Sequence, residues 1–115
     1  MILIPLEEDK KTITSGFRKA PFFVFLDPSK GIVFEENTHK SDKSSLFFEN
    51  FLRYKVKNIY VKALGYKTYL KLNSLNIKVY FILDTIVEYS HIDPKTLILL
   101  HSENAKGLCT LGHKR

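Results

Sequence analysis

The chain has 115 residues, a formal net charge of +6, a 44% share of hydrophobic residues and a single cysteine. This length is typical of a single domain, and the share of hydrophobic residues predicts a packed core and not a disordered chain. No apolar run approaches the ~20 residues that cross a bilayer, and one cysteine cannot form an intrachain disulfide, so the composition favours a cytoplasmic globular protein with acidic partners.

The first part of the chain predicts one strand and a hairpin. Residues 2–6 are apolar but brief and are followed by acidic residues, so they predict a strand rather than a signal peptide. The run Phe-Phe-Val-Phe-Leu at 22–26 is typical of a strand buried on both faces. The stretch Asp-Pro-Ser-Lys-Gly at 27–31 is turn chemistry, which predicts that residues 32–36 pair back antiparallel.

Helices and strands then alternate. N-cap candidates followed by phenylalanines at helical spacing predict a helix over about 43–56. Residues 58–61 predict a strand. Tyr66, Tyr69, Leu70 and Leu72 predict the apolar face of a second helix, ending at Asn76, which can close it in the left-handed conformation.

The last part of the chain predicts another buried strand over 77–83 and, from the capping-box spacing of 85–88, a third helix. The run 97–100 is too short to assign by periodicity. No element is assigned to residues 102–115, and a mobile tail is one interpretation of them.

This order of elements predicts an α/β protein. Right-handed crossovers would make the strands at 2–6, 58–61 and 77–83 parallel, in a mixed sheet covered by helices on both faces. Ligands of such sheets collect outside the carboxyl ends of the parallel strands.

The stretch ITSGFRKAPFFVFLD, residues 13–27, resembles a family signature that runs roughly Ser-x-His-Phe-Gly-x-Ala-x-x-Phe into a strand. This is the signature of the dinitrogenase iron-molybdenum cofactor biosynthesis family, the nitrogenase accessory domains of NifX and NafY type. Its matching residues are Thr14, Phe17, Ala20, Pro21 and Phe23. A second match, in residues 58–82, is carried by Gly65, Leu70, Leu72, Ile77, Val79 and Tyr80.

The resemblance spans about residues 2–90, and it implies a single accessory-factor domain over 1–115. It implies a three-layer ribonuclease H-like fold, in which a mixed five-stranded sheet has its second strand antiparallel and helices lie on both faces. It also implies a role in nitrogen fixation: binding of an iron–sulfur or iron–molybdenum cofactor or its precursor, with protein partners in cofactor assembly. Two positions depart from the pattern, because Gly16 stands at the family's histidine and Arg18 at its glycine.

Two loops supply the candidate binding site. Arg18 and Lys19 follow Gly16, and Gly65 precedes a predicted helix whose free amides favour an anion. We expect these loops to meet at the carboxyl edge of the sheet and to hold a negatively charged cluster, oxoanion or phosphate. Asn37 and His39 stand where members of the resembling family often place an asparagine and then a histidine after the third strand, and His39 is the best-placed candidate ligand. The alternative is a turn glycine beside two solvated cations.

Three residues separate Cys109 from His113 near the end of the chain, and with His39 they form the candidate metal ligands. Thiolate and imidazole suit iron, zinc or copper. The alternative is a structural or incidental role, since no second cysteine completes a set.

Other functions have less support in the sequence. The first strand carries no acid to help Asp27 and Asp84 hold two metal ions, so we do not expect a nuclease. Phosphate-loop and nucleophile-elbow motifs are also missing, and we expect no enzyme. Basic residues among tyrosines over 53–71 could contact nucleic acid, but packing explains the tyrosines better. The sequence therefore predicts a cofactor carrier. The alternatives are a ligand-free protein-interaction module and a weak nucleic-acid-binding domain of the same fold.

Overall fold

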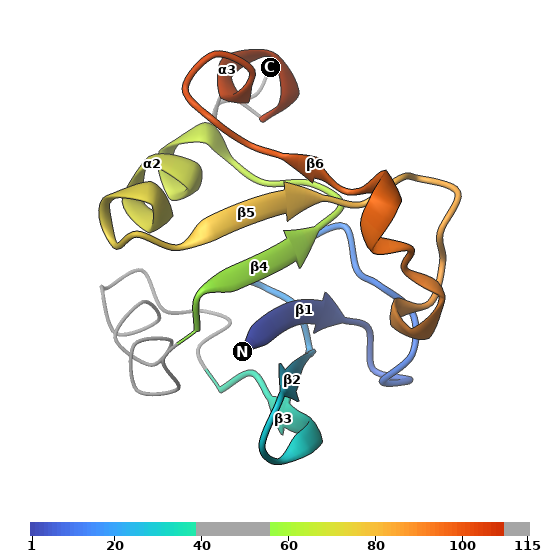
Figure 1. Cartoon of the computed structure of the whole chain (residues 1–115). Coiled ribbons are helices and arrows are strands. Elements are labelled where there is room, and N and C mark those ends of the chain that lie inside the picture. Colours follow the sequence, from blue (N-terminus) through green and yellow to red (C-terminus); the bar gives the residue numbers. More distant parts are fainter. Residues whose placement is uncertain (39–55, 110–115) are drawn as a thin grey trace.

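The computed structural model describes residues 1–38 and 56–109, and these residues build one open sheet (Figure 1). The sheet has six strands in the order β3-β2-β1-β4-β5-β6. Their bounds are β1 Ile2–Leu6, β2 Phe22–Asp27, β3 Gly31–Glu36, β4 Asn58–Val61, β5 Lys78–Phe81 and β6 Ile98–Leu99. The helix predicted over 43–56 falls almost wholly outside the described residues.

The pairing of the strands follows the expected order. β1 is parallel to β4 and β4 to β5, which confirms the three parallel strands. β2 runs antiparallel to both β1 and β3, as the resemblance implies. The sheet has one strand more than the five expected, because the two-residue β6 pairs antiparallel with β5. The mixed α/β class is therefore confirmed.

The hairpin of β2 and β3 is closed by the predicted turn. Gly31 has φ +82°, a conformation that glycine adopts without a Cβ penalty. The Asp27 carboxylate accepts hydrogen bonds of 2.9 Å from both the amide and the hydroxyl of Ser29. These bonds fix the turn and lower the pKa of Asp27.

In the described part of the chain, one helix covers the first face of the sheet. α2 spans Tyr66–Ser74 and buries Tyr69 and Leu72, whereas Leu70 is 47% exposed and was wrongly placed on the apolar face. Asn76, with φ +62°, closes this segment in the left-handed region, as predicted.

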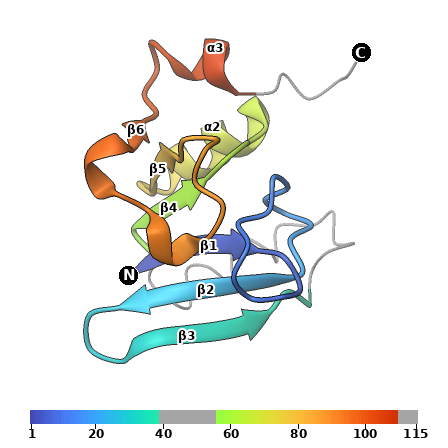
Figure 2. The same cartoon turned by 90° about the vertical axis from the view of Figure 1, so that its right-hand side faces the viewer.

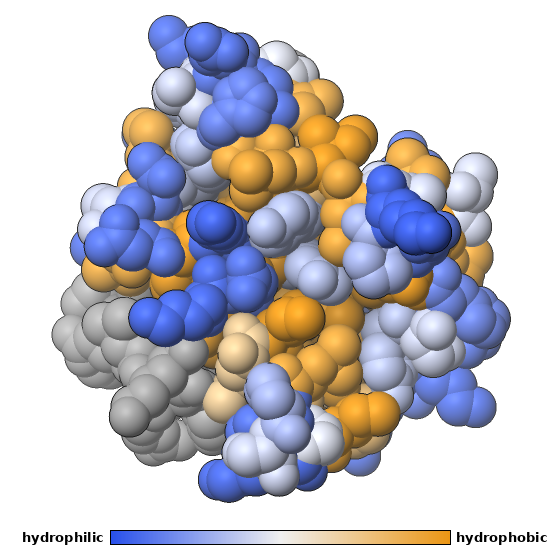
Figure 3. All heavy atoms as spheres, viewed as in Figure 1, coloured by the Kyte–Doolittle hydropathy of each residue, from blue (hydrophilic) through white to orange (hydrophobic). Residues whose placement is uncertain are grey.

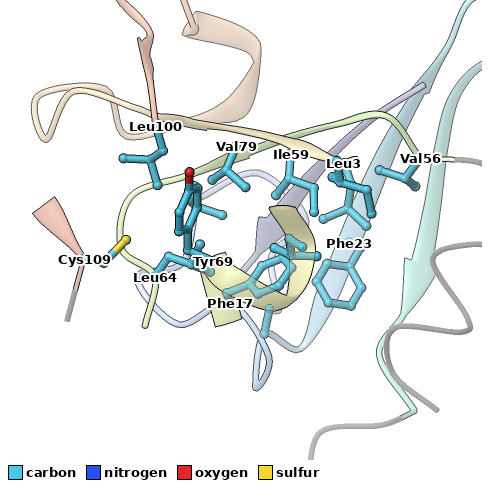
Figure 4. Packing of buried hydrophobic residues seen from close by; sticks show 14 of the residues in the cluster. Leu3, Phe17, Phe23, Val56, Ile59, Leu64, Tyr69, Val79, Leu100 and Cys109 are labelled. Carbon is cyan, nitrogen blue, oxygen red and sulfur yellow. The ribbon is translucent and has the colours of Figure 1, made fainter. Parts of the chain in front are cut away.

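The larger part of the core lies beneath α2 (Figure 4). Leu3, Ile59 and Val79 project into it from three adjacent parallel strands, and Phe17 and Phe23 close it on one side. Burial of these apolar side chains is the main source of stability for such a layer.

The second face of the sheet is covered by irregular chain rather than by the third helix expected near 85–88 (Figure 2). Two short 3-10 turns lie there, η1 at Tyr89–His91 and η2 at Pro94–Thr96. The helix is prevented because the backbone of this segment bridges the loop after β1. Ile13 donates its amide to the carbonyl of Val87 at 2.9 Å, and Thr12 bridges Glu88. Among the described residues, the expectation of α-helices on both faces is thus wrong.

The predicted tail is structured up to residue 109. α3 spans Ala105–Leu108, and Ala105 and Cys109 are buried against the core beneath α2. Residues 110–115 lie outside the described part of the chain. Across 1–38 and 56–109, no helix is both long and apolar enough to cross a membrane.

Candidate functional site

The candidate site lies where the chain leaves β1 and β4. β1 and β4 are neighbouring parallel strands, but the chain leaves them toward opposite edges of the sheet. After β1 it continues to β2 on one side, and after β4 it continues through α2 to β5 on the other side. A sheet opens a crevice at such a switch point, outside the carboxyl ends of the strands. Ligands of open α/β sheets commonly bind there.

A pocket of about 190 Å³ occupies this position. Both predicted loops contribute to its wall, so the expectation that they meet at one edge of the sheet is confirmed. The lining residues come from the loop after β1 and from the turn and first helical residues after β4: Ser15, Gly16, Phe17, Arg18, Ala63, Leu64, Gly65 and Thr68.

The loop after β1 is anchored on both sides of its cationic stretch. Phe17 is buried and packs edge-to-face on Phe23, with ring centroids 6.2 Å apart. Asn37, directly after β3, donates its side-chain amide to the carbonyl oxygens of Arg18 at 2.8 Å and Ala20 at 2.9 Å. These contacts hold the backbone of Arg18 at the pocket.

The two cations of the loop differ in position. Arg18 is half-buried and lines the pocket, whereas Lys19 is exposed and lies outside the lining set. An arginine at a partly enclosed site can make paired, charge-assisted hydrogen bonds to an anion. Of the two predicted cations, Arg18 is therefore the one that the structure brings to the pocket.

The other side of the pocket is the start of α2. Gly65 is the N-cap, no side chain caps the helix, and no acidic residue lies in its first turn. The helix dipole and the first-turn amides of α2 therefore present positive charge to the pocket without a competing carboxylate. Gly16 contributes less than expected, because its amide donates to the Thr14 hydroxyl at 3.3 Å.

The predicted metal ligands are only partly described. His39 and His113 lie outside the described residues. Cys109 is 6% exposed and packs among core residues near Tyr69 and Leu64 (Figure 4). Burial raises the pKa of its thiol, which keeps the group protonated at neutral pH. Within 1–38 and 56–109, no three His, Cys, Asp or Glu residues group together as a metal site.

The described residues of the candidate nucleic-acid surface do not share one environment, because some are buried in the core and others are exposed to solvent. Tyr69 is buried in the core, while Lys67 and Lys71 are exposed on α2. Arg53, Tyr54 and Lys55 lie outside the described residues. The packing interpretation of Tyr69 is confirmed.

Three polar residues of the site were not singled out as binding residues from the sequence. Ser15 and Thr68 bring hydroxyl groups to the pocket wall, and Asn37 holds the loop from behind. Asn37 follows β3 at a position that the family resemblance already marks. Thr68 could have been found from its place in the first helical turn after Gly65, beside the backbone amides that have no partner within the helix.

A larger cavity, of about 400 Å³, lies on the second face of the sheet between β1, β2 and the 3-10 turns. Its wall is apolar apart from hydroxyl groups and includes Ile32, Tyr60 and Tyr89, with no charged side chain among the lining residues. This cavity therefore offers no cation to an anionic ligand.

Comparison with known proteins identifies the fold only. No family model and no curated protein match the chain. Among solved structures, the protein PH0822 aligns with a TM-score of 0.57 and 24% identity, over 71% of this chain and 76% of its own. A Thermotoga protein, TM1290, described as a "putative NifB protein" of the DUF35 family, aligns with a TM-score of 0.58 and 18% identity. That alignment covers 71% of this chain and 75% of the other.

Proposed function

We propose that this chain is a cytoplasmic, non-enzymatic carrier for an anionic iron–sulfur or iron–molybdenum type cofactor, or for a precursor of one, in nitrogenase cofactor assembly. The cofactor binds in the pocket between the two loops. The observation that carries the proposal is that Arg18 and the uncapped start of α2 line the same pocket.

Charge and geometry support this assignment. A cation on one wall and helix amides on another stabilise a ligand whose negative charge lies between them. The wall also carries the hydroxyl-bearing residues Ser15 and Thr68, which can donate to sulfide or oxide.

The fold gives a second, weaker line of support. The mixed sheet with β2 antiparallel agrees with the accessory-domain fold that the sequence resemblance implies, although β6 adds a sixth strand. The structural neighbour TM1290 is described as a putative NifB protein. At 18% identity this likeness shows the fold alone, and the support for the ligand comes from the pocket.

The size of the pocket limits how a cofactor would be held. Its volume of about 190 Å³ is smaller than the space that encloses most organic ligands. We therefore propose that the protein binds one face of a cluster. The rest of the cluster stays exposed and accessible to the protein that receives the cofactor. A small precursor anion would fit inside entirely.

Anaerobic reconstitution tests the proposal. The full chain is incubated with iron, sulfide and molybdate, desalted, and examined by metal analysis and visible absorption. We expect a coloured protein with metal retained in a fixed ratio to the chain. A colourless, metal-free protein would overturn the carrier function and favour the protein-interaction module.

A further inference from the structure

The cavity of about 400 Å³ on the second face of the sheet is separate from the candidate anion pocket, and the two share no lining residue. Its floor crosses three adjacent strands, on which Ile32, Leu26 and Ile2 lie directly opposite one another. On the face viewed in Figure 3, an apolar area lies between the hairpin of β2 and β3 and the segment that carries the 3-10 turns. Such a floor favours an apolar ligand over water.

The segment that covers the cavity is held in place by named contacts. Tyr89, which lines the cavity, donates its amide to the carbonyl of Lys11 at 3.1 Å. Its ring packs edge-to-face on Phe34 of β3, with ring centroids 6.0 Å apart. The next turn, η2, is closed by Asp93, whose carboxylate accepts the amide of Lys95 at 3.0 Å. Floor and cover are both fixed, so the cavity is preformed, as small-molecule sites usually are.

Hydroxyl groups are the only polar side-chain groups among the lining residues, and Tyr60, Tyr89 and Ser90 carry them. In the described part of the chain, the hydroxyls of Tyr60 and Tyr89 have no hydrogen-bond partner, so water or a ligand must satisfy them. Burial and the neighbouring Tyr80 raise the pKa of Tyr60, which keeps its hydroxyl protonated and able to donate.

The size and the polarity of the cavity limit its ligand. An apolar cavity of ~150 Å³ binds a single benzene ring. A cavity of about 400 Å³ therefore has room for two fused rings, and it lies within the range of ~300–1,000 Å³ that is typical of small-molecule sites. No lining residue is charged, so an ionised ligand would lose its hydration without gaining an ion pair.

We propose that this cavity is a second ligand site, which binds a neutral compound of two fused aromatic rings that carries a hydrogen-bond acceptor. The rings contact the isoleucine and leucine side chains of the floor, and the acceptor takes a hydrogen bond from Tyr60 or Tyr89. Contacts with the two tyrosine rings add to the apolar burial. This inference does not depend on the proposed cofactor function.

Quinoline is the probe, since it has two fused rings, is uncharged at neutral pH and carries one ring nitrogen that accepts a hydrogen bond. Isothermal titration calorimetry of the full chain should give a dissociation constant between about 10 μM and 1 mM, as expected for a ligand of this size. No detectable binding at millimolar concentrations would overturn the proposal.

A charged probe tests the polarity of the site. Naphthoate, an anion with two fused rings, is titrated into Arg18→Ala so that the anion pocket does not capture it. It should bind at least about tenfold more weakly than quinoline, because the cavity offers no cation. Quinoline itself should bind Arg18→Ala as it binds the parent, which separates this site from the anion pocket. Equal affinity for the two probes would contradict a site for neutral ligands.

Filling the cavity tests the location. Ile92 lines the cavity and packs against the apolar cluster on this face, so Ile92→Trp places a larger ring there. It should weaken quinoline binding at least about tenfold. Val87→Trp, at an exposed residue of the same segment outside the lining set, is the matched control and should leave the affinity unchanged. Equal affinity of the two variants would place the ligand elsewhere, and circular dichroism checks that each is folded.

Removing a hydroxyl tests the hydrogen bond. Tyr60→Phe and Tyr89→Phe keep the rings, and at least one of them should weaken quinoline binding about two- to tenfold. Naphthalene, which has the same shape but no acceptor, should bind these variants and the parent equally. Tyr66→Phe, at a residue packed against the core beneath α2, is the control. Unchanged quinoline binding in both cavity variants would refute the acceptor.

Sedimentation equilibrium tests the competing occupant, a second copy of this chain. We expect quinoline to bind without changing the oligomeric state. A dimer that dissociates as quinoline binds would assign the cavity to the second copy and overturn the proposal.

Discussion

The side-chain amide of Asn37 donates a 2.8 Å hydrogen bond to the carbonyl oxygen of Arg18, nineteen residues earlier in the chain. This bond, with its companion to Ala20, ties the end of β3 to the loop that carries the pocket's cation. Asn37 is 4% exposed, so the bond is protected from water. The conformation of the site therefore depends on a residue outside the pocket wall.

Asn37→Ala should lower the free energy of unfolding by about 1–3 kcal/mol, because two loop carbonyls lose a buried donor. It should also weaken anion binding, since the backbone of Arg18 is released. Urea denaturation measures the first effect and metal uptake the second. Thr38→Ala, at an exposed neighbour, is the control and should change neither.

Arg18→Ala should reduce uptake of the cofactor about tenfold, because one charge-assisted contact is lost. Lys19→Ala should change it by less than about twofold, because an exposed charge outside the pocket is screened by salt. Both variants should keep the melting temperature within a few degrees of the parent. Equal losses from the two substitutions would point to a diffuse electrostatic effect instead of a site.

Gly65→Asp should abolish anion binding while preserving or raising the melting temperature. An aspartate at the N-cap accepts hydrogen bonds from the first-turn amides of α2 and places a negative charge in the pocket. The backbone of Gly65 is extended, with φ −70° and ψ 145°, and residues other than glycine also adopt this conformation. Gly65→Ser caps without charge and should retain measurable binding. Full binding by the aspartate variant would place the ligand elsewhere.

Gly16→His should increase iron retention after anaerobic reconstitution, because it restores an imidazole at the position where the resembling family has one. The substitution should not disturb folding, since a Cβ at Gly16 meets no atom within 4 Å. Gly16→Gln, of similar size but a poor metal ligand, is the comparison. Iron content per chain and the visible spectrum are the measurements, and identical spectra for both variants would argue against a cluster at this pocket.

Stability should fall as the pH rises above about 8.5, the ordinary pKa of a thiol. Burial raises the pKa of Cys109 in the folded protein, so the folded state holds this proton more tightly than the unfolded chain. The resulting stabilisation is complete below the unfolded pKa and is lost as the pH rises toward the folded one. Denaturation midpoints between pH 7 and pH 10 should decline less steeply in Cys109→Ala. An unchanged slope would assign the decline to other groups, such as Tyr69, whose pKa burial also raises.

The parallel strands and the hairpin were predictable because their signals are local. The continuous apolar run of β2 and the Asp-Pro-Ser-Lys-Gly turn specify a buried strand and its reversal within a few residues. Asn76 likewise marks the end of its helical segment by its own backbone preference. Such features need no knowledge of distant contacts.

The third helix was mispredicted because its competitor is distant in sequence. The segment 85–88 has capping-box spacing, but its backbone bonds to Thr12 and Ile13, more than seventy residues earlier. Leu70 was misplaced for a related reason, since helical spacing alone does not say how wide the buried stripe is. In this segment, tertiary hydrogen bonding outweighs the local helix propensity.

By itself, the sequence determined the α/β class, the parallel strands and the two loops that carry the candidate site, because these follow from periodicity and turn chemistry. Only the tertiary structure decided that Arg18 and not Lys19 lines the pocket, that Asn37 holds it, and that Cys109 is buried. The physical reason is that a side chain's environment is set by segments that meet only when the sheet forms. Residue composition and spacing do not specify which distant segments come into contact.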